Sequence, residues 1–262
     1  MKILSWNCHY GFTPEKAKVI ENLNSNILII IECRKIDMNI NISGYNEYNR
    51  NWYGDHKEAL DNEGILNDKK DLGIGVFWKE GISVTRLVEW DKTWRHNSDF
   101  RYLVPYEVKG DFKPFTLVTV WTKNKMDASD PLDYIQKAHA AIDHYYNNGL
   151  FNGRVVLIGD FNSNVIWDKL YKENMNHTEF VKKLNRMGIQ ECLPSEKEKN
   201  YFTYCYYRGK PCEVVDDYCF TSSDIANTAK LSISSSNEWT NVEPKRWNGS
   251  DHCPISVEFD IN

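Results

Sequence analysis

Two short segments of the chain are apolar from end to end. Residues 27–31 read ILIII and residues 155–158 read VVLI. Because they are too short for helices and rich in β-branched side chains, they predict strands that are buried on both faces. Such strands occur in sheets that other layers of structure cover. An acidic residue follows each run closely, Glu32 after the first and Asp160 after the second.

The rest of the chain mixes many predicted strands with a few predicted helices. Further strands are expected at 2–6, 73–78, 83–90, 101–108, 115–121, 202–207, 214–221, 230–234 and 255–259. Helices are expected at 14–23 with Thr13 as the N-cap, at 131–147, and at 177–187 with Gly188 as the stop. The polar and acidic residues 49–71 predict a long surface loop. With no linker or repeat in view, this order favours packed sheets with helices outside, in a single domain over residues 1–262.

The composition bears on where such a protein works and what it binds. Of the 262 residues, 41% are hydrophobic, and no apolar run is long enough to cross a bilayer, so we expect no membrane insertion. The chain begins MKILSWNC without an export leader, and its seven cysteines form no CxxC pair. We therefore expect a cytoplasmic protein, with no protein partner evident. The net charge of −5 does not exclude a phosphate-bearing partner, because carboxylates that bind a metal ion also lower the total.

Polar residues stand beside the predicted strands at five places. These groups are Asn7, Glu32, Asp160 with Asn162, Asp217, and Asp251 with His252. Each alone has a structural explanation, because Asn and Asp also cap helices and begin turns. Together they indicate an oxygen-rich site for Mg²⁺ or Mn²⁺, with an Asp–His pair that can bind phosphate or move a proton. That chemistry suits hydrolysis of a phosphate ester, and P-loop, GxSxG and HExxH motifs are absent.

Seven motifs follow one another along nearly the whole chain. They are ILSWNC at 3–8, IIIEC at 29–33, LGIGVFWKEG at 72–81, LVTVWTKN at 117–124, IGDFNSN at 158–164, VDDYCFTS at 215–222 and SDHCPISVEF at 250–259. In this order they resemble the endonuclease/exonuclease/phosphatase superfamily, which includes DNase I-like nucleases, abasic-site endonucleases, inositol-phosphate phosphatases and sphingomyelinases. GDFN and SDH-x-P together are the most specific part. The resemblance implies a four-layered α/β sandwich, with two mixed β-sheets face to face and helices on the outside.

The resemblance also implies roles for the polar groups. Asn7, Glu32 and Asp251 would form the metal site, with Glu32 as the direct ligand of Mg²⁺. Asp160 would orient or deprotonate the attacking water, and Asn162 would hold a phosphate oxygen. These roles agree with the hard-metal chemistry that the residue types themselves indicate.

The carboxylate partner of the histidine has two candidates. The resemblance implies that Asp217 orients His252, which would contact or protonate the phosphate. Asp216, at a position that is usually hydrophobic in the superfamily, competes for the same role. Alternation along a strand places Asp217 with Cys219 on one face and Asp216 with Tyr218 on the other, so we favour Asp217.

Two further positions depart from the superfamily pattern. Trp121 stands where a His or Tyr usually contacts the phosphate or the leaving group, and an indole offers only its N–H. Either the proton for the leaving group comes from elsewhere, or the metal makes it unnecessary. His9 replaces an amide or a carboxylate after the first strand, either as a partner of the metal ligands or as a plain surface histidine.

Two more residues are candidates for contact with the substrate. His177 follows the GDFNSN segment and either reaches the site or is a solvent-exposed helix cap. Arg101 begins a strand whose counterpart in the superfamily often carries a phosphate-facing arginine, although a surface salt bridge explains it equally well.

The sequence therefore predicts a Mg²⁺-dependent hydrolase of phosphate esters, with Mn²⁺ as the alternative ion, acting on DNA or RNA as an endo- or exonuclease. A phosphatase or phosphodiesterase for a small-molecule or lipid-headgroup ester is the alternative, because the loop 49–71 is not basic as a duplex-binding insertion would be. A third alternative is a catalytically inactive binding module of the same fold. Trp121 keeps it open, whereas the presence of Glu32, Asp160 and His252 argues against it.

Overall fold

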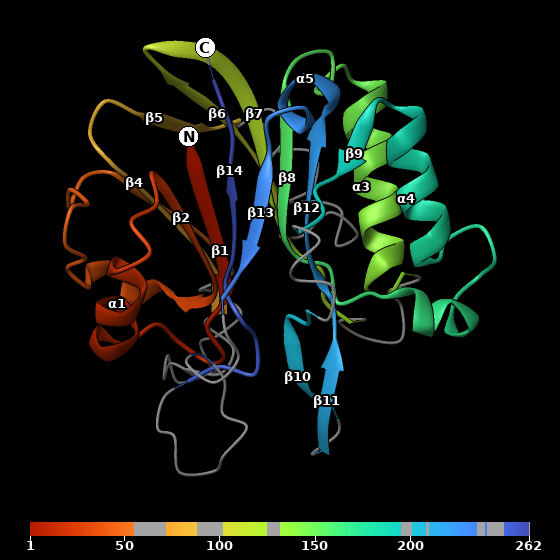
Figure 1. Cartoon of the computed structure of the whole chain (residues 1–262), viewed down its shortest axis with the longest axis horizontal. Helices are drawn as coiled ribbons and strands as arrows, with labels where there is room; N and C mark the ends of the chain where they lie inside the picture. The colour runs from red at the N-terminus through yellow and green to blue at the C-terminus, as the bar shows by residue number, and fades with distance from the viewer. Residues whose placement is uncertain are drawn as a thin grey trace, which may run out of the picture.

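The computed structural model describes residues 1–54, 72–87, 102–124, 132–194, 201–207, 210–234, 239 and 249–261. Within these residues, two six-stranded mixed sheets lie face to face (Figure 1). The first sheet contains, in spatial order, β13 (Lys230–Ile233), β14 (Ile255–Glu258), β1 (Lys2–Asn7), β2 (Ile27–Arg34), β4 (Leu72–Trp78) and β3 (Arg50–Gly54). The second contains β5 (Ser83–Arg86), β6 (Leu103–Gly110), β7 (Phe112–Trp121), β8 (Val155–Asp160), β12 (Asp217–Ser222) and β9 (Ile189–Glu191).

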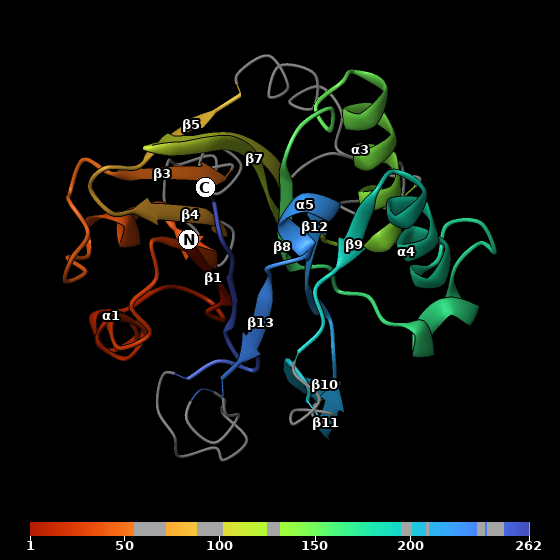
Figure 2. The same ribbon diagram turned by 45° about the horizontal axis from the view of Figure 1, so that its top comes forward.

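Helices cover the outer face of each sheet. The helix α1 (Pro14–Glu21) lies over the first sheet, and α3 (Ile135–Asn147) and α4 (His177–Arg186) lie together over the second (Figures 1 and 2). As predicted, Thr13 caps α1, its hydroxyl accepting a hydrogen bond from Lys16 N. In the part of the chain that the structure describes, short helical segments also connect other elements: η1 (Lys35–Asn39), η3 (Val165–Leu170) and α5 (Ser223–Ala226). The order helix, sheet, sheet, helix confirms the predicted four-layered α/β sandwich.

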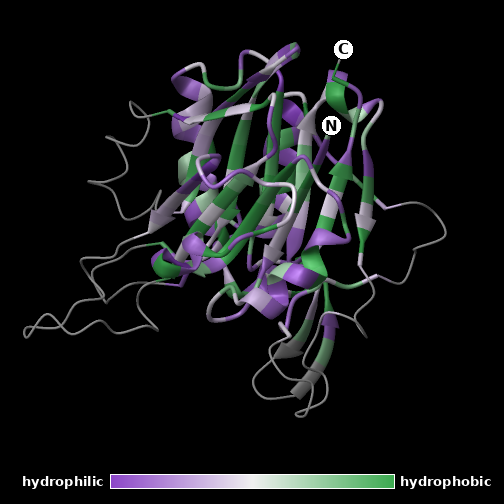
Figure 3. Cartoon of the chain, turned by 90° about the vertical axis from the view of Figure 1, so that its left-hand side faces the viewer, coloured by the Kyte–Doolittle hydropathy of each residue, from purple (hydrophilic) through white to green (hydrophobic). Residues whose placement is uncertain are grey.

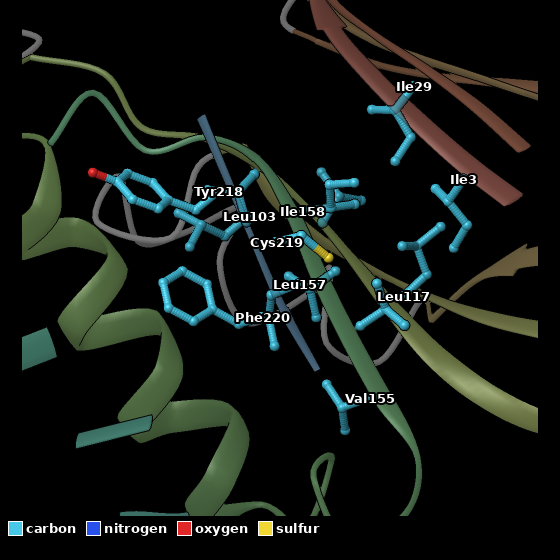
Figure 4. Close-up of a cluster of buried hydrophobic side chains, with 14 of the residues drawn as sticks. Ile3, Ile29, Leu103, Leu117, Val155, Leu157, Ile158, Tyr218, Cys219 and Phe220 are labelled. Atoms are coloured by element: carbon cyan, nitrogen blue, oxygen red, sulfur yellow. The ribbon is translucent and has the colours of Figure 1, made fainter. Parts of the chain in front are cut away.

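Side-chain alternation along the strands fills the spaces between the layers. Ile3 of β1 and Ile29 of β2 point toward Ile158 of β8, in the core between the two sheets (Figure 4). On the opposite face of the second sheet, Leu157 and Phe220 pack against α3 (Figure 4). Figure 3 shows the same division along the chain, with apolar residues concentrated in the strands and polar ones in the helices and connections. Along each strand, every second side chain faces the other sheet, and these side chains form an inner row. A residue at the end of an inner row therefore points into the space between the sheets.

Three details differ from the elements expected from the sequence. Residues 50–54 of the expected loop form β3, which pairs with β4 at the edge of the first sheet. The expected strand 214–221 is two strands, because β11 (Lys210–Val214) pairs with β10 (Tyr204–Tyr207) in a separate ribbon while β12 pairs with β8. The strand β9 had no signal in the sequence. The expected strand positions 88–90 and 101, the helix start at 131 and residues 55–71 of the loop lie outside the described residues.

Among the described residues, no helix has the length and apolar character needed to cross a membrane.

Candidate active site

The polar residues expected at strand ends lie together at one end of the sandwich. β1 ends at Asn7, and β8 and β12 run antiparallel with Asp160 opposite Asp217. A hydrogen bond of 3.0 Å from Asn7 Nδ2 to Asp160 Oδ2 joins the two sheets. Asn7 and Asp160 continue the inner rows that contain Ile3 and Ile158, so strand alternation alone aims them at each other.

Glu32 joins them through a β-bulge in β2. Ile31 packs between the two sheets and Ile30 packs beneath α1, so strict alternation would turn Glu32 toward α1. Instead, the pairing of β2 with β4 shifts register between Ile31 and Cys33, and Glu32 takes a left-handed φ of 60°. Cys33 then packs beneath α1, where alternation would not place it. The extra residue thus turns the Glu32 side chain toward Asn7.

Asn7 holds two carboxylates at once. Its Nδ2 donates to Glu32 Oε1 at 3.1 Å as well as to Asp160, and its Oδ1 accepts a hydrogen bond from His9 N at 3.1 Å. The bond from His9 sets the orientation of the amide, with the NH₂ group toward the carboxylates. Tyr10 N donates to the other oxygen of Glu32, at 2.9 Å. Asn7, predicted as part of the metal site, therefore presents donors to its two acidic neighbours and turns its oxygen to the loop.

Asp160 is a buried acid whose proton is poised near neutrality. Its Oδ1 accepts a hydrogen bond from Asn162 N at 2.8 Å, where Asn162 has a left-handed φ of 44°. Burial raises the pKa of Asp160 to about 7, against the lowering effect of His252. Asn162 donates one amide hydrogen to Thr122 O at 3.0 Å, and a carboxamide has a second N–H. The pair thus combines a base of suitable pKa with a donor.

His252 is buried beside three carboxylates. Its Nδ1 lies 2.8 Å from Asp217 Oδ2 and 3.7 Å from Asp216 Oδ1, and its carbonyl accepts a hydrogen bond from Trp6 Nε1 at 2.9 Å. Burial by itself lowers the pKa of His252, but Asp217, Asp216 and Asp160 outweigh it and hold that pKa well above its ordinary value. The surrounding carboxylates thus favour the protonated imidazole, with Nδ1 facing Asp217.

Both adjacent carboxylates face His252, unlike the arrangement expected from alternation. The strand β12 begins at Asp217, so Asp216 precedes it and is not bound by the alternation of its side chains. Of the two, Asp217 makes the closer contact, in agreement with the preference from the sequence. Burial raises the pKa of Asp216 well above its ordinary value, which favours a proton on this group and reduces the repulsion between the acids.

His9 pairs with a predicted metal ligand at the rim of this site. Its Nδ1 lies 3.0 Å from Asp251 Oδ1, and the two side chains are 39% and 21% exposed. Burial raises the pKa of Asp251, but the hydrogen bond from His9 and the nearby His252 outweigh it, so the pKa lies below its ordinary value. Asp251 is thus an ionised carboxylate within reach of solvent.

The carboxylates at the rim are of the chemical type that a hard divalent cation prefers. Glu32 uses one acceptor position on each oxygen, whereas an ionised carboxylate has about four, so it and Asp251 can still ligate. Oxygen ligands of this kind suit Mg²⁺ or Mn²⁺. Among the described residues, Asp160, Asp216 and His252 also bring ligating atoms within 4.8 Å of one another. A cation at this group would need the neutral form of the imidazole as its ligand.

Trp121 lies beside the polar residues in the sheet but packs as a core residue. It pairs with Asp160 in the register of β7 and β8, and it is buried. Its ring lies 4.9 Å from that of Tyr102 and 4.3 Å from the ammonium of Lys123, measured to ring centroids. Its packing against these side chains explains why a large ring occupies this position.

His177 is buried and contacts the segment that follows Asn162. Its Nδ1 lies 3.1 Å from Ser163 Oγ, and its ring centroid is 4.9 Å from that of Tyr218. With 8% of its surface exposed, it is not the solvent-exposed cap that the sequence allowed. It thus supports the segment that follows Asn162. Arg101 lies outside the described residues.

Two residues that the sequence analysis did not single out also shape the site. Ser250 Oγ donates to Asn7 O at 2.5 Å and accepts from His252 N at 3.0 Å, which ties the first strand to the last motif. Lys16 is 4% exposed, and its ammonium donates to three backbone carbonyls of the loop that follows β1, including His9 O at 3.1 Å. A lysine on the apolar face of a predicted helix was the signal that could have revealed the second of these.

No family model matches the chain, and no curated protein matches it in sequence. Solved structures share its fold. The 3′-5′ exonuclease NExo from Neisseria meningitidis superposes with a TM-score of 0.65 at 18% identity, over 99% of this chain and 100% of that one. A second NExo structure from Neisseria, described as a 3′ phosphatase bound to a product DNA hairpin, has a TM-score of 0.65 at 16% identity over 99% of both chains. An AP endonuclease from Archaeoglobus fulgidus has a TM-score of 0.61 at 16% identity over 100% of both.

These similarities confirm the DNase I-like fold expected from the resemblance to the endonuclease/exonuclease/phosphatase superfamily. Because the sequence identities are below one fifth, the similarities establish the fold alone, and the chemistry has to be argued from the residues of this chain.

Proposed function

We propose that the chain is a divalent-metal-dependent phosphodiester hydrolase, most simply a nuclease that acts on DNA or RNA. The observation that carries the proposal is the polar network between the sheets, which runs from Glu32 through Asn7 to Asp160 beside the Asp217–His252 pair. It combines hard metal ligands, a carboxylate of near-neutral pKa and a charged imidazole, which together supply what hydrolysis of a phosphate ester requires.

On the metal side, Glu32 and Asp251 would hold the ion through carboxylate oxygens. Asn7 and His9 keep these two carboxylates in place, because each donates a hydrogen bond to one of them. A divalent ion, when bound, polarises a phosphoryl oxygen and stabilises charge on the leaving oxygen. We assign Asn7 to positioning because its oxygen accepts from the backbone N–H of His9.

On the other side, Asp160 would take the proton of the attacking water. Its pKa of about 7 keeps a large ionised fraction at neutral pH together with useful basicity. Asn162 would hold a phosphate oxygen with its second amide N–H. These assignments keep the roles that the resemblance implies.

His252 would serve as the charged donor to the phosphate or the leaving oxygen. Because Asp217 occupies Nδ1, the Nε2–H is the group left to face the substrate. This arrangement supplies a proton without Trp121, whose ring packs against Tyr102. The unusual tryptophan is then compatible with catalysis.

Nucleic acid is the substrate class that the rim favours. Tyr10 follows His9, is 59% exposed, and its ring stands edge-on to that of His9 with centroids 4.5 Å apart. An exposed aromatic ring beside metal-binding carboxylates can stack on a base next to the scissile phosphate. The fold neighbours add support, since one is described with a product DNA hairpin and another as an AP endonuclease.

The proposal is tested by hydrolysis of single-stranded DNA, duplex DNA, RNA and bis-p-nitrophenyl phosphate with Mg²⁺, Mn²⁺ or EDTA. We expect cleavage of nucleic acid with the metal ions and none with EDTA. Asp160→Asn and His252→Ala should lower kcat by about 10²–10⁴-fold. Asp143→Asn is the matched control, because this carboxylate lies half-exposed on α3 and pairs with Lys183, so wild-type rates are expected.

Two outcomes would change the assignment. If no substrate is cleaved with either metal and both site variants match the wild type, the inactive binding module becomes the correct description. If only the small ester is turned over, the nuclease part is wrong and a small-molecule or lipid-headgroup ester takes its place.

A further inference from the structure

Thr203, just before β10, makes three side-chain hydrogen bonds to the pair of acids that faces His252. Its hydroxyl oxygen accepts from Asp216 N at 3.1 Å and from Asp217 N at 3.0 Å. The hydroxyl hydrogen is directed to Asp216 Oδ1 at 3.3 Å. Thr203 itself is fully buried. One hydroxyl thus satisfies two buried backbone donors and one carboxylate oxygen.

These bonds are needed because of how the chain passes from β11 to β12. The strand β11 ends at Val214 and β12 begins at Asp217, so Asp216 lies between two different strand pairings. Asp216 O accepts from Phe161 N at 2.8 Å, which ties this junction to the residue after Asp160. The N–H groups of Asp216 and Asp217 find their acceptor in Thr203. Without the hydroxyl, two buried donors would lose their acceptor.

The backbone around Thr203 also holds the histidine side of the pair. Thr203 O accepts from Cys253 N at 2.7 Å, and Cys205 N donates to Asp251 O at 2.9 Å. Between these bonds the ring of Tyr204 lies 4.8 Å from the imidazole of His252, measured between centroids. The backbone of residues 203–205 therefore forms hydrogen bonds with the chain on both sides of His252, while the Thr203 hydroxyl forms hydrogen bonds with Asp216 and Asp217.

We propose that Thr203 is a positioning residue that selects Asp217, rather than Asp216, as the partner of His252. The hydroxyl bond draws Asp216 Oδ1 away from the imidazole and leaves it 3.7 Å from Nδ1, while Asp217 Oδ2 lies at 2.8 Å. The carbonyl of Thr203 also accepts a hydrogen bond from Cys253 N, which restrains the backbone next to His252. Thr203 thus sets both ends of the Asp217–His252 contact. The kinetic part of this inference rests on the proposed function, whereas the geometric part does not.

The test compares Thr203→Val, which keeps the shape and removes the hydroxyl, with Thr203→Ser, which keeps the hydroxyl. The first readout is the NMR signal of the proton on His252 Nδ1 in ¹⁵N-labelled protein. We expect Thr203→Ser to retain the wild-type signal, and Thr203→Val to shift or lose it. This readout requires no activity, so it decides the inference even if the chain hydrolyses none of the substrates.

The second readout is kinetic, with bis-p-nitrophenyl phosphate or the best nucleic acid substrate. Thr203→Val should lower kcat by about 10–100-fold, as expected for a misplaced catalytic group, with KM changed by less than about 2-fold. Thr203→Ser should stay within about 3-fold of the wild type. In an Asp217→Asn background, Thr203→Val should cost almost nothing further, because both changes remove the same contact.

The inference is overturned if Thr203→Val leaves the Nδ1 proton signal and kcat unchanged. It is also overturned if the losses from Thr203→Val and Asp217→Asn multiply, since a residue that only stabilises the fold acts independently of Asp217. If Thr203→Val does not fold, Thr203→Cys replaces it, because a thiol keeps the volume and bonds weakly. The same outcomes then apply to the cysteine variant. Absence of hydrolysis by the wild type would refute the proposed function and leave the NMR comparison to judge Thr203.

Discussion

His177 should make the stability of the protein depend on pH in a predictable direction. Burial lowers the pKa of His177 from its ordinary value of 6.5 to about 4, against the raising effect of Asp168 and with a small lowering from His139. The unfolded chain therefore binds a proton between these two values that the folded chain excludes. Stability from this residue is fully present above pH 6.5 and is lost as the pH falls toward 4.

The size of the effect follows from the two pKa values. The whole shift corresponds to about 3 kcal/mol, and linkage places about 2 kcal/mol of it between about pH 7.5 and about pH 5. Urea unfolding of the wild type and of His177→Gln at both pH values measures it, since glutamine does not titrate. Other groups, including Asp160, titrate in both proteins and cancel in the comparison. We expect the free energy of unfolding of the wild type to fall by about 2 kcal/mol more than that of the variant.

A control variant separates this effect from the loss of any histidine. His144→Gln removes a half-buried histidine from α3 and should leave most of the pH dependence in place. If the difference in the free energy of unfolding between the wild type and His177→Gln is the same at both pH values, His177 is not held neutral. The reasoning would also fail if the variant lost more stability than the wild type on acidification.

Three further substitutions test the fold around the site, each by urea unfolding monitored by circular dichroism. Gly159→Ala should cost at least ~3 kcal/mol or prevent folding, because the new Cβ would lie 2.0 Å from a backbone oxygen of β7. Gly153→Ala, whose Cβ meets nothing within 4 Å, should cost under ~1 kcal/mol. Equal losses of stability in the two variants would contradict this reasoning. Lys16→Met should cost about 3 kcal/mol because three backbone carbonyls, two of them in buried hydrogen bonds, lose a charged donor. The exposed Lys18→Met on the same helix should change stability by less than ~0.5 kcal/mol. If Lys16→Met left the stability unchanged, water would replace the ammonium. Phe161→Ala should cost about 3–5 kcal/mol because its ring packs among three other aromatic rings, and a loss below ~1 kcal/mol would refute that packing.

The layers of the fold could be predicted from the sequence because the order of apolar and polar residues indicates which strands are buried and on which faces. The runs 27–31 and 155–158 are apolar on both faces, and each lies inside its sheet with a layer on either side. The positions of Asn7 and Asp160 could be predicted for the same reason, since each lies at the end of an apolar strand. Side-chain alternation then turns Asn7 and Asp160 toward the space between the two sheets.

Contacts that depend on where one strand stops pairing with its neighbour could not be predicted from the order of residue types. The division of 214–221 into β11 and β12 comes from a change of partner strand, which no local pattern encodes. That division is what leaves Asp216 free of strand alternation and close to His252. Thr203 serves both acids from 13 and 14 residues away, so its role is invisible until the junction has been placed.

The backbone at the site departs most from what residue type predicts. His9, Tyr10, Glu32 and Asn162 have φ values of 51°, 54°, 60° and 44°, a left-handed conformation that costs roughly 1–2 kcal/mol per residue. Three of these residues turn a backbone N–H onto a side chain of the network, from His9 to Asn7, from Tyr10 to Glu32 and from Asn162 to Asp160. The acceptors of Tyr10 and Asn162 are carboxyl groups, and a hydrogen bond to a charged group contributes about 1.5–3 kcal/mol, which is enough to offset the strain at these two residues. The strained backbone at Tyr10 and Asn162 is therefore stable only while Glu32 and Asp160 are in place, so the local backbone and the polar network determine each other.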